Sequence, residues 1–233
     1  MSTSERRDPV GGIGMTSERT RLRMVERLRS AGIQDEVVLA AMAAVPRHLF
    51  IEEAFASRAY DFDVALPIGC GQTISQPLTV ARVTELARAG GPIGKVLEIG
   101  SGSGYQAAVL AHLAREVYAV ERHKELAEAA RNRVVRQLRL ANLRMRHADG
   151  LKGLPEAAPF DAIVISAALP HIPDELLAQL ADGGRLVLPR GTAGNEQRLC
   201  LIQRTGSRFL ESTHDAVRFV PALLGKTVPS ARR

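Results

Sequence analysis

The chain has 233 residues, 45% of them hydrophobic and 24% charged, which predicts one globular domain with a sizeable core. No apolar run approaches the roughly 18 residues of a membrane span, and the two cysteines, Cys70 and Cys200, have neither disulfide-framework nor zinc spacing, which fits the cytoplasm. A formal net charge of +6 permits an acidic partner, but the arginine groups are typical of solvated helix faces, and 4% aromatic residues leave little for base stacking.

The first part of the chain is predicted to be helical after a short tail. Residues 1–18 mix charges, glycines and a proline without an apolar core, so we expect a disordered tail and no secretion signal. Apolar spacing predicts two helices between Thr20 and about Val45, the second capped by Asp35. A short helix is expected over Glu52–Arg58.

A further helix is expected from Pro77 through Ala89, because proline is tolerated in the first helical turn. An irregular stretch is expected between Arg58 and the segment Pro67–Pro77, and Gly90-Gly91-Pro92 closes the helix.

From Lys95 the sequence alternates short β-branched runs with helical segments, as parallel strands joined by crossover helices do. Helices are expected over Gln106–Ala114, from Leu126 to Leu138 and after Pro173. After Pro189 no segment is long enough for a crossover helix, so the last strands are expected to be antiparallel at the sheet edge. The expected strands are Val96–Ile99, Val117–Val120, Leu143–His147, Ala162–Ile165, Leu186–Leu188, Leu199–Gln203, Phe209–Ser212 and Val217–Val220.

The first of these strands leads into Gly100-Ser101-Gly102-Ser103-Gly104, with a helix behind it. Glycines in such a turn permit positive φ and let a ligand approach the backbone. In the dinucleotide fingerprint the third glycine follows the second by three residues, a position held here by Tyr105, whereas Gly104 follows Gly102 by only two. This spacing is similar to the first motif of S-adenosylmethionine-dependent methyltransferases, and the lack of Gly-Lys-Ser/Thr removes the P-loop interpretation.

Three acidic residues lie within or directly after the predicted parallel strands, at the ends where the turn is expected. Glu121 ends a strand 21 positions after Gly100 and can accept hydrogen bonds from both hydroxyls of a ribose. Glu98 lies inside the first strand, where a carboxylate needs a partner, so we expect it to hydrogen-bond the turn or to lie near the cationic end of a ligand. Asp149-Gly150 follows the third strand, and its spacing alone leaves open a ligand contact or an Asp-Gly turn without function.

The segment before the turn reads Pro67-Ile68-Gly69-Cys70-Gly71-Gln72-Thr73-Ile74-Ser75-Gln76-Pro77. Interpreted locally, Ser75 or Gln76 caps the helix that begins near Pro77. Cys70 has no activating partner visible in the sequence. The six histidines are scattered without the i,i+4 spacing of a helical metal pair, so no metal site is expected.

This segment resembles the signature of the protein-L-isoaspartate O-methyltransferases of bacterial type. The resemblance runs from about Thr20 to Gly225. Tyr60-Asp61-Phe62-Asp63 is about one residue longer than the usual approach to the signature, so no acidic role is assigned between Asp61 and Asp63. The resemblance also covers Gly32-Ile33-Gln34-Asp35, Val45-Pro46-Arg47, Leu97-Glu98-Ile99-Gly100, Pro159-Phe160-Asp161-Ala162-Ile163 and Val217-Arg218-Phe219-Val220-Pro221.

The resemblance implies a doubly wound, Rossmann-like α/β methyltransferase fold with a mostly parallel sheet, antiparallel edge strands and an N-terminal helical cap. It implies transfer of a methyl group from S-adenosylmethionine to the free α-carboxyl of L-isoaspartyl residues in damaged proteins, which gives the methyl ester and S-adenosylhomocysteine. Ser75 is the implied catalytic residue. The implied cofactor-binding residues are Thr73, Ile74, Ser75, Glu98, Gly100, Ser101, Gly102, Ser103, Gly104, Glu121, Arg122, Asp149 and Gly150.

The implied chemistry requires no general base. A carboxyl group with a pKa near 4 is already ionised at neutral pH, so Ser75 is expected to orient the carboxylate as a hydrogen-bond donor. Strands near Val217–Val220 are expected to pair with an extended substrate peptide.

Two other functions stay open. A nucleic-acid methyltransferase is one, although Ser166-Ala167-Ala168-Leu169-Pro170 lacks the Asn/Asp-Pro-Pro-aromatic element that stacks on a target base. A catalytically silent cofactor-binding module that recognises protein partners is the other. We expect a monomer with residues 19–225 as one methyltransferase domain (19–77 the helical cap and active-site segment, 78–225 the cofactor-binding core) and 226–233 as a tail, without nucleic-acid or membrane partners.

Overall fold

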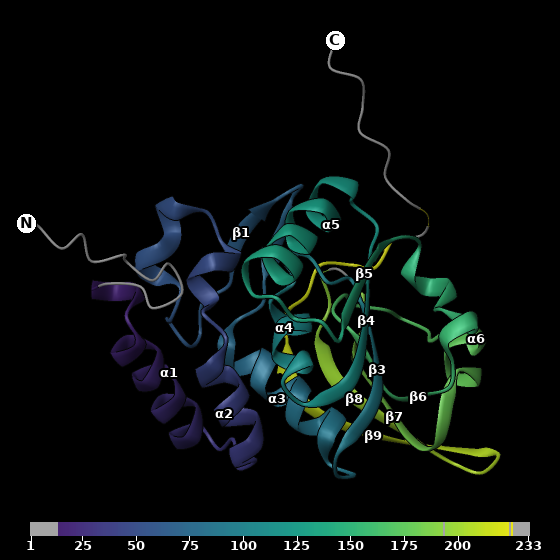
Figure 1. Cartoon of the computed structure of the whole chain (residues 1–233). Helices are drawn as coiled ribbons and strands as arrows, with labels where there is room; N and C mark the ends of the chain where they lie inside the picture. Colours follow the sequence, from purple (N-terminus) through teal and green to yellow (C-terminus); the bar gives the residue numbers. More distant parts are fainter. Residues whose placement is uncertain (1–13, 193, 224, 226–233) are drawn as a thin grey trace, which may run out of the picture.

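A seven-stranded sheet with the order β5-β4-β3-β6-β7-β8-β9 forms the centre of the molecule, in a computed structural model that describes residues 14–192, 194–223 and 225 (Figure 1). The first five strands run parallel, and β8 and β9 add antiparallel pairs at one edge. The predicted fold class is therefore confirmed. The strands are β3 (Ile93–Ile99), β4 (Ala114–Glu121), β5 (Leu143–His147), β6 (Phe160–Ile165), β7 (Leu180–Arg190), β8 (Gln197–Thr205) and β9 (Arg208–Val217).

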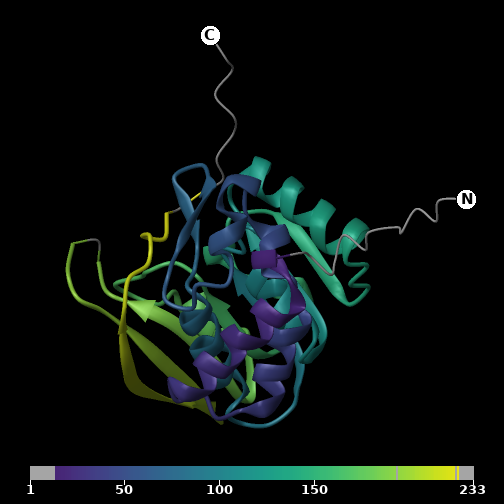
Figure 2. The same cartoon turned by 90° about the vertical axis from the view of Figure 1, so that its left-hand side faces the viewer.

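Helices cover both faces of the sheet. On one face lie α3 (Pro77–Arg88), α4 (Tyr105–Ala111) and α5 (Lys124–Arg131), which continues as a π-helical turn over Asn132–Gln137. Outside them pack α1 (Glu18–Ser30) and α2 (Glu36–Ala44), which Figure 2 shows in front of the sheet. The other face carries α6 (Asp174–Ala178) and the 3-10 turns Gly150–Lys152 and Pro155–Ala157.

Alternating side chains of the strands pack into two cores. Val96 belongs to the core beneath the N-terminal helices, and its neighbour Leu97 belongs to the core beneath α6, as the period of two in a strand requires. Because both neighbours are apolar, the strand is buried on both faces, which is typical of parallel sheets.

Local signals place the N-terminal helices. Asp35 caps α2 as predicted, because its side chain accepts hydrogen bonds from the backbone N–H groups of Val37 and Val38. Ser17 caps α1 after a 3-10 turn over Gly14–Thr16, so residues 14–18, which were expected to belong to a disordered tail, are ordered. Residues 1–13 and 226–233, both predicted tails, lie outside the described residues.

A β-hairpin lies in the segment before α3, where the sequence predicted no strands. Its strands are β1 (Leu66–Gly69) and β2 (Gln72–Ile74), with Cys70 at the tip in the left-handed region at φ 52°. The hairpin lies beside α5 in Figure 1, and the Cys70 thiol is 3.7 Å from a carboxylate oxygen of Glu125. Two expected helices also differ: Glu53–Arg58 is a 3-10 helix, and α4 ends at Ala111 because Ala114 already pairs in β4 with Ile93.

The chain after β8 departs from the predicted strands. Phe209–Ser212 and Val217 belong to the single strand β9, and Val217–Val220 is not a strand of its own. The side chain of Gln197 explains the break, since it donates to the carbonyl of Phe219 at 3.1 Å and accepts from its N–H at 2.6 Å.

The segment beyond the break crosses back over the sheet. The carbonyl of Val220 accepts from the N–H of Ala168 at 2.8 Å, and the N–H of Ala222 donates to the carbonyl of Ala168 at 2.9 Å. Residues 220–223 therefore lie against the loop that leaves the carboxyl end of β6.

Candidate active site

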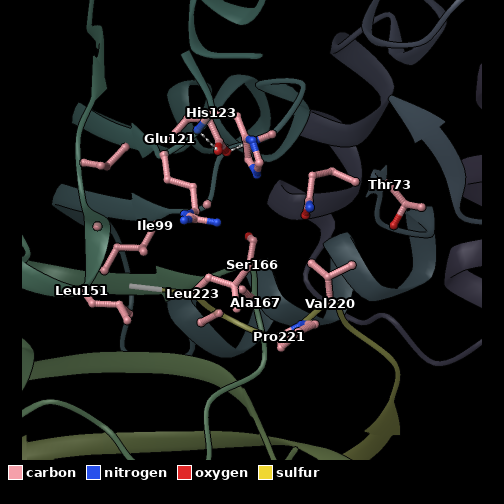
Figure 3. A pocket seen from close by; sticks show the side chains of 17 residues that line it. Thr73, Ile99, Glu121, His123, Leu151, Ser166, Ala167, Val220, Pro221 and Leu223 are labelled. Carbon is pink, nitrogen blue, oxygen red and sulfur yellow. Dashed lines mark hydrogen bonds between the residues drawn. The ribbon is translucent and has the colours of Figure 1, made fainter. Parts of the chain in front are cut away.

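A cleft opens at the carboxyl ends of β3 and β6, where the strand order of the sheet reverses. It consists of two adjoining cavities, a larger and a smaller one, which share the lining residues Thr73, Gly100, Gly102 and Ser166. Figure 3 shows Glu121 and His123 on one side of the larger cavity, Val220 and Pro221 on the other, and Ser166 between them. The hairpin, the strand ends and the returning C-terminal segment thus meet at one site.

The glycine turn after β3 forms the floor of the cleft. Gly100, Gly102 and Gly104 have φ values of 80°, 52° and 88°, which L residues with a side chain rarely adopt. Gly104 caps α4, and a Cβ there would lie 3.1 Å from the Cβ of Ala130. The turn therefore needs glycine both for backbone conformation and for close packing of α5.

Glu121 anchors this turn to the end of β4. Its carboxylate accepts hydrogen bonds from the N–H groups of Gly102 and His123, each at 2.8 Å, while the residue lines the larger cavity. It is 5% exposed, so a ligand hydroxyl that reached it would meet a carboxylate already fixed in direction. The structure thus places Glu121 in the wall of the cleft beside the glycine turn, and its contact with a ribose stays a prediction.

Glu98 lies deeper and lacks such support. The residue is 1% exposed, one carboxylate oxygen is 3.5 Å from the Ser166 hydroxyl, and the other has no hydrogen-bond partner among the described residues. Of the two expected settings for Glu98, the hydrogen bond to the glycine turn is not formed among the described residues. The place near the cationic end of a ligand stays a prediction, and Glu98 and the turn line the smaller cavity together. Burial, with a contribution from the charge of Glu121, raises the pKa of Glu98 to about 8.

Ser75 does not cap the helix that follows it. The N-cap of α3 is Gln76, which makes no side-chain cap bond, and the N–H of Leu78 donates instead to the carbonyl of Phe62 at 3.0 Å. The capping interpretation of Ser75 is wrong, and the helix leaves its hydroxyl unused. Thr73 lines both cavities, and Ile74 and Ser75 line the smaller one.

Two predicted residues lie just behind the cleft lining. Gly104 supports the turn from the side of α5, and Asp149 accepts hydrogen bonds from the N–H groups of Leu151 at 3.2 Å and Gly225 at 2.9 Å. Arg122 lines the larger cavity, and its Nε donates to the carbonyl of Gly225 at 3.0 Å. The predicted residues that line either cavity are Thr73, Ile74, Ser75, Glu98, Gly100, Ser101, Gly102, Ser103, Glu121, Arg122 and Gly150.

Several lining residues were missed by the sequence interpretation. Ser166 and Ala167 directly follow β6, so the rule that ligands bind at carboxyl ends of parallel strands could have found them. His123 could have been found in the same way, two positions after Glu121. Val220 was expected near the substrate, but as part of a strand. No local signal points to Ala222 and Leu223, because the place of this segment depends on pairing with Ala168.

The cleft carries polar groups for an organic ligand. Over the residues that the structure describes, no group of three or more His, Cys, Asp and Glu side chains could hold a metal ion. Among those residues, too, no helix is both long and apolar enough to cross a bilayer. The buried carboxyl group of Glu98, which lacks a full set of partners, fits the cationic end of a ligand. The carboxylate of Glu121 beside the glycine turn fits a sugar.

Comparison with known proteins gives a consistent result. The family described as Protein-L-isoaspartate(D-aspartate) O-methyltransferase (PCMT) matches residues 19–227. A protein-L-isoaspartate O-methyltransferase of Methylobacillus flagellatus is 58% identical over 220 residues, which cover 93% of this chain and 97% of that protein. One of Azoarcus sp. is 62% identical over 208 residues, which cover 89% of this chain and 94% of that protein.

Solved structures agree with the sequence matches. A protein-L-isoaspartate O-methyltransferase superposes with a TM-score of 0.78 at 28% identity, covering 88% of this chain and 67% of that chain. A Plasmodium falciparum protein solved in complex with S-adenosyl-L-homocysteine superposes with a TM-score of 0.73 at 25% identity, covering 87% of this chain and 98% of that chain.

Proposed function

The chain belongs to the protein-L-isoaspartate(D-aspartate) O-methyltransferase family and is an S-adenosylmethionine-dependent methyltransferase of isoaspartyl residues in damaged proteins. From this we propose which part of its cleft holds the cofactor and which part orients the substrate. The turn and the strand ends hold the cofactor, and Ser75, directly after β2, orients the carboxylate that receives the methyl group. The observation that carries this division is that Ser75 and the glycine turn line the same cavity.

The cleft residues fit S-adenosylmethionine. The unpartnered oxygen of Glu98 is buried where the smaller cavity meets the turn, so it suits the cationic end of the cofactor. Glu121 suits the two ribose hydroxyls. Gly150 suits the base, since a Cβ there would lie 2.4 Å from Cγ2 of Ile99 and would force that wall to move. When bound, the cofactor supplies a methyl group on a positively charged sulfur.

Ser75 acts by orientation. The substrate carboxylate is already ionised at neutral pH, so the protein has no proton to remove. The Ser75 hydroxyl donates a hydrogen bond to one carboxylate oxygen and leaves the other oxygen toward the methyl group. Holding the two reacting groups in line and excluding water account for most of the rate in such a reaction.

Recognition of the isoaspartyl linkage depends on geometry. This linkage places the free carboxylate directly on Cα and continues the chain through the side-chain carbonyl. A groove between Thr73 and Val220, which both line the larger cavity, can accept such a kinked backbone. The expected strand at Val217–Val220 is absent, and the carbonyl of Val220 is already bonded to Ala168, so we propose side-chain contacts in place of strand pairing at this point.

The test offers labelled S-adenosylmethionine with an isoaspartyl peptide, the matched aspartyl peptide and bulk RNA. Wild type is expected to give base-labile label on the isoaspartyl peptide alone. Ser75→Ala is expected to lose at least tenfold in kcat and to keep the Kd of S-adenosylhomocysteine within threefold. Ser212→Ala, which removes an exposed hydroxyl from β9, serves as the matched control. Full turnover by Ser75→Ala contradicts the role of Ser75, and label on RNA favours the nucleic-acid alternative.

We further propose that the chain acts on protein substrates as a cytoplasmic monomer, without nucleic acid, and that residues 19–225 form one methyltransferase domain. Support for one domain comes from a single apolar core that joins Met24 and Leu39 of the N-terminal helices to Val96 and Val187 of the sheet. Sedimentation of the purified chain tests the monomer.

A further inference from the structure

A buried arginine closes the base of the loop that carries Ser75. Arg47 begins the short 3-10 helix Arg47–Phe50 and is 0% exposed. Its Nε donates to the carbonyl of Ala59 at 2.8 Å, and its Nη2 donates to the carbonyl of Ser75 at 2.7 Å. One guanidinium group therefore holds both ends of the loop from Ala59 to Ser75, which contains the hairpin β1–β2.

The same guanidinium lies against the first residue after the glycine turn. It is 4.7 Å from the ring centroid of Tyr105, which begins α4 directly after Gly104. Tyr105 is itself buried, with the ring of Phe50 5.5 Å away at a steep angle and the sulfur of Met42 3.7 Å from its hydroxyl. Arg47 thus contacts both Tyr105, which directly follows the glycine turn, and the segment that carries Ser75.

Stability alone does not explain an arginine at this position. Burial lowers the pKa of Arg47 to about 10, and its Nη1 is buried without a hydrogen-bond partner in the described part of the chain. Replacing buried charged groups with apolar residues of similar volume is often neutral or stabilising. What a guanidinium offers is a planar set of donors that can reach two carbonyls in different directions at once, which the single ammonium of lysine cannot match.

We propose that Arg47 is a positioning residue for methyl transfer. Through its bonds to the carbonyls of Ala59 and Ser75, it fixes the Ser75 hydroxyl and the hairpin relative to the glycine turn. The hairpin is packed on that turn, since Cδ1 of Ile68 lies 3.1 Å from where a Cβ on Gly102 would stand. The role rests on the proposed function of Ser75. A displacement of about 1 Å in a reacting group can reduce a rate about 100-fold, so loss of the two bonds should appear in kcat.

The experiment compares Arg47→Lys and Arg47→Met with Arg88→Lys and Arg88→Met. Arg88 is a suitable control because it is a partly buried arginine that joins α3 to the cap of α2, through Nε at 2.7 Å from Asp35, and does not line either cavity. For each variant kcat and KM on an isoaspartyl peptide, the Kd of S-adenosylhomocysteine and the Tm are measured.

Both Arg47 variants are expected to lose at least tenfold in kcat, with the methionine variant worse, while the Kd of S-adenosylhomocysteine stays within threefold. The Arg88 variants are expected to lower the Tm and to keep kcat within twofold. The proposal is overturned if the Arg47 variants lose no more kcat than Arg88 variants of equal Tm, or if their affinity for S-adenosylhomocysteine falls in proportion to kcat.

A second measurement covers the case in which Arg47→Met does not fold. In the S-adenosylhomocysteine complex of Arg47→Lys, the amides of residues 64–76 are expected to exchange hydrogen faster than in wild type, and unchanged exchange overturns the proposal. Failure of the proposed function looks different. If the wild type is inactive on the isoaspartyl peptide, or if Ser75→Ala is fully active, the proposed role of the site itself is wrong. If the wild type is active and Arg47→Lys is unimpaired, only the proposed role of Arg47 is wrong.

Discussion

The buried carboxyl group of Glu98 should make the stability of the cofactor-free protein depend on pH. Glu98→Gln keeps the shape of the side chain and removes its ionisation. The residue is 1% exposed, and burial together with the charge of Glu121 raises its pKa from 4.5 to about 8. The folded protein therefore binds this proton more tightly than the unfolded chain does. As the pH rises from 4.5 to 8, Glu98 lowers the free energy of unfolding.

The size of the effect follows from the shift. At about 1.4 kcal/mol per pKa unit, a rise from 4.5 to about 8 corresponds to ~5 kcal/mol in all, of which about 3 kcal/mol falls between pH 5 and pH 8. Glu98→Gln has no such dependence. Relative to wild type, the variant should therefore gain about 3 kcal/mol in the free energy of unfolding as the pH is raised from 5 to 8.

Urea unfolding followed by circular dichroism at four pH values from 5 to 8 measures this difference. Glu128→Gln, on the exposed face of α5, is the control and should show no comparable trend relative to wild type. A difference between Glu98→Gln and wild type that does not change with pH would refute the reasoning, because it would mean that the Glu98 carboxyl keeps an ordinary pKa in the fold.

Three further changes test other parts of the cleft. Glu121→Gln should raise the Kd of S-adenosylhomocysteine at least tenfold in calorimetry, since it weakens both the ribose contact and the bond to Gly102; an unchanged Kd contradicts this. Gly104→Ala should lower the free energy of unfolding by about 1–3 kcal/mol in urea titrations, because φ is 88° and the new Cβ would meet Ala130; equal midpoints contradict it. Gln197→Leu should speed amide exchange in residues 218–223, because it removes both bonds to Phe219; unchanged protection contradicts it.

Much of the cofactor side of the cleft could be predicted from local sequence. The strand Leu143–His147 was predicted with both its ends, since its alternation and its flanks are local signals. The turn at Gly100 and the carboxylate of Glu121 follow from one topological rule, namely that parallel strands present their carboxyl ends at the same edge. Such features need no knowledge of which distant segments pack together.

The substrate side could not be predicted in this way because tertiary contacts decide it. Ser75 was a reasonable cap from its place before Pro77, but the carbonyl of Phe62 takes the N–H of Leu78 and removes the need for one. The side chain of Gln197 ends a strand that β propensity alone would continue. In each case a partner far away in sequence satisfies a backbone group, and local propensity does not contain that information.

The charges of the cleft constrain how it can accelerate the reaction. Glu98 and Glu121 line the two cavities that we propose for the cofactor, and the guanidinium of Arg47 donates to the carbonyl of Ser75. In the proposed arrangement the ionised carboxylates favour a bound sulfonium and the guanidinium favours a bound carboxylate, but both reacting charges disappear as the methyl group moves. Interactions that are stronger in the ground state than in the transition state favour binding and do not raise kcat. Glu98→Gln should therefore raise the KM for S-adenosylmethionine more than it lowers kcat. Arg47→Lys keeps the charge but changes the position of Ser75, so it should lower kcat on the peptide more than it raises the KM for S-adenosylmethionine. If both variants change the same kinetic parameter, the separation of binding and positioning is wrong.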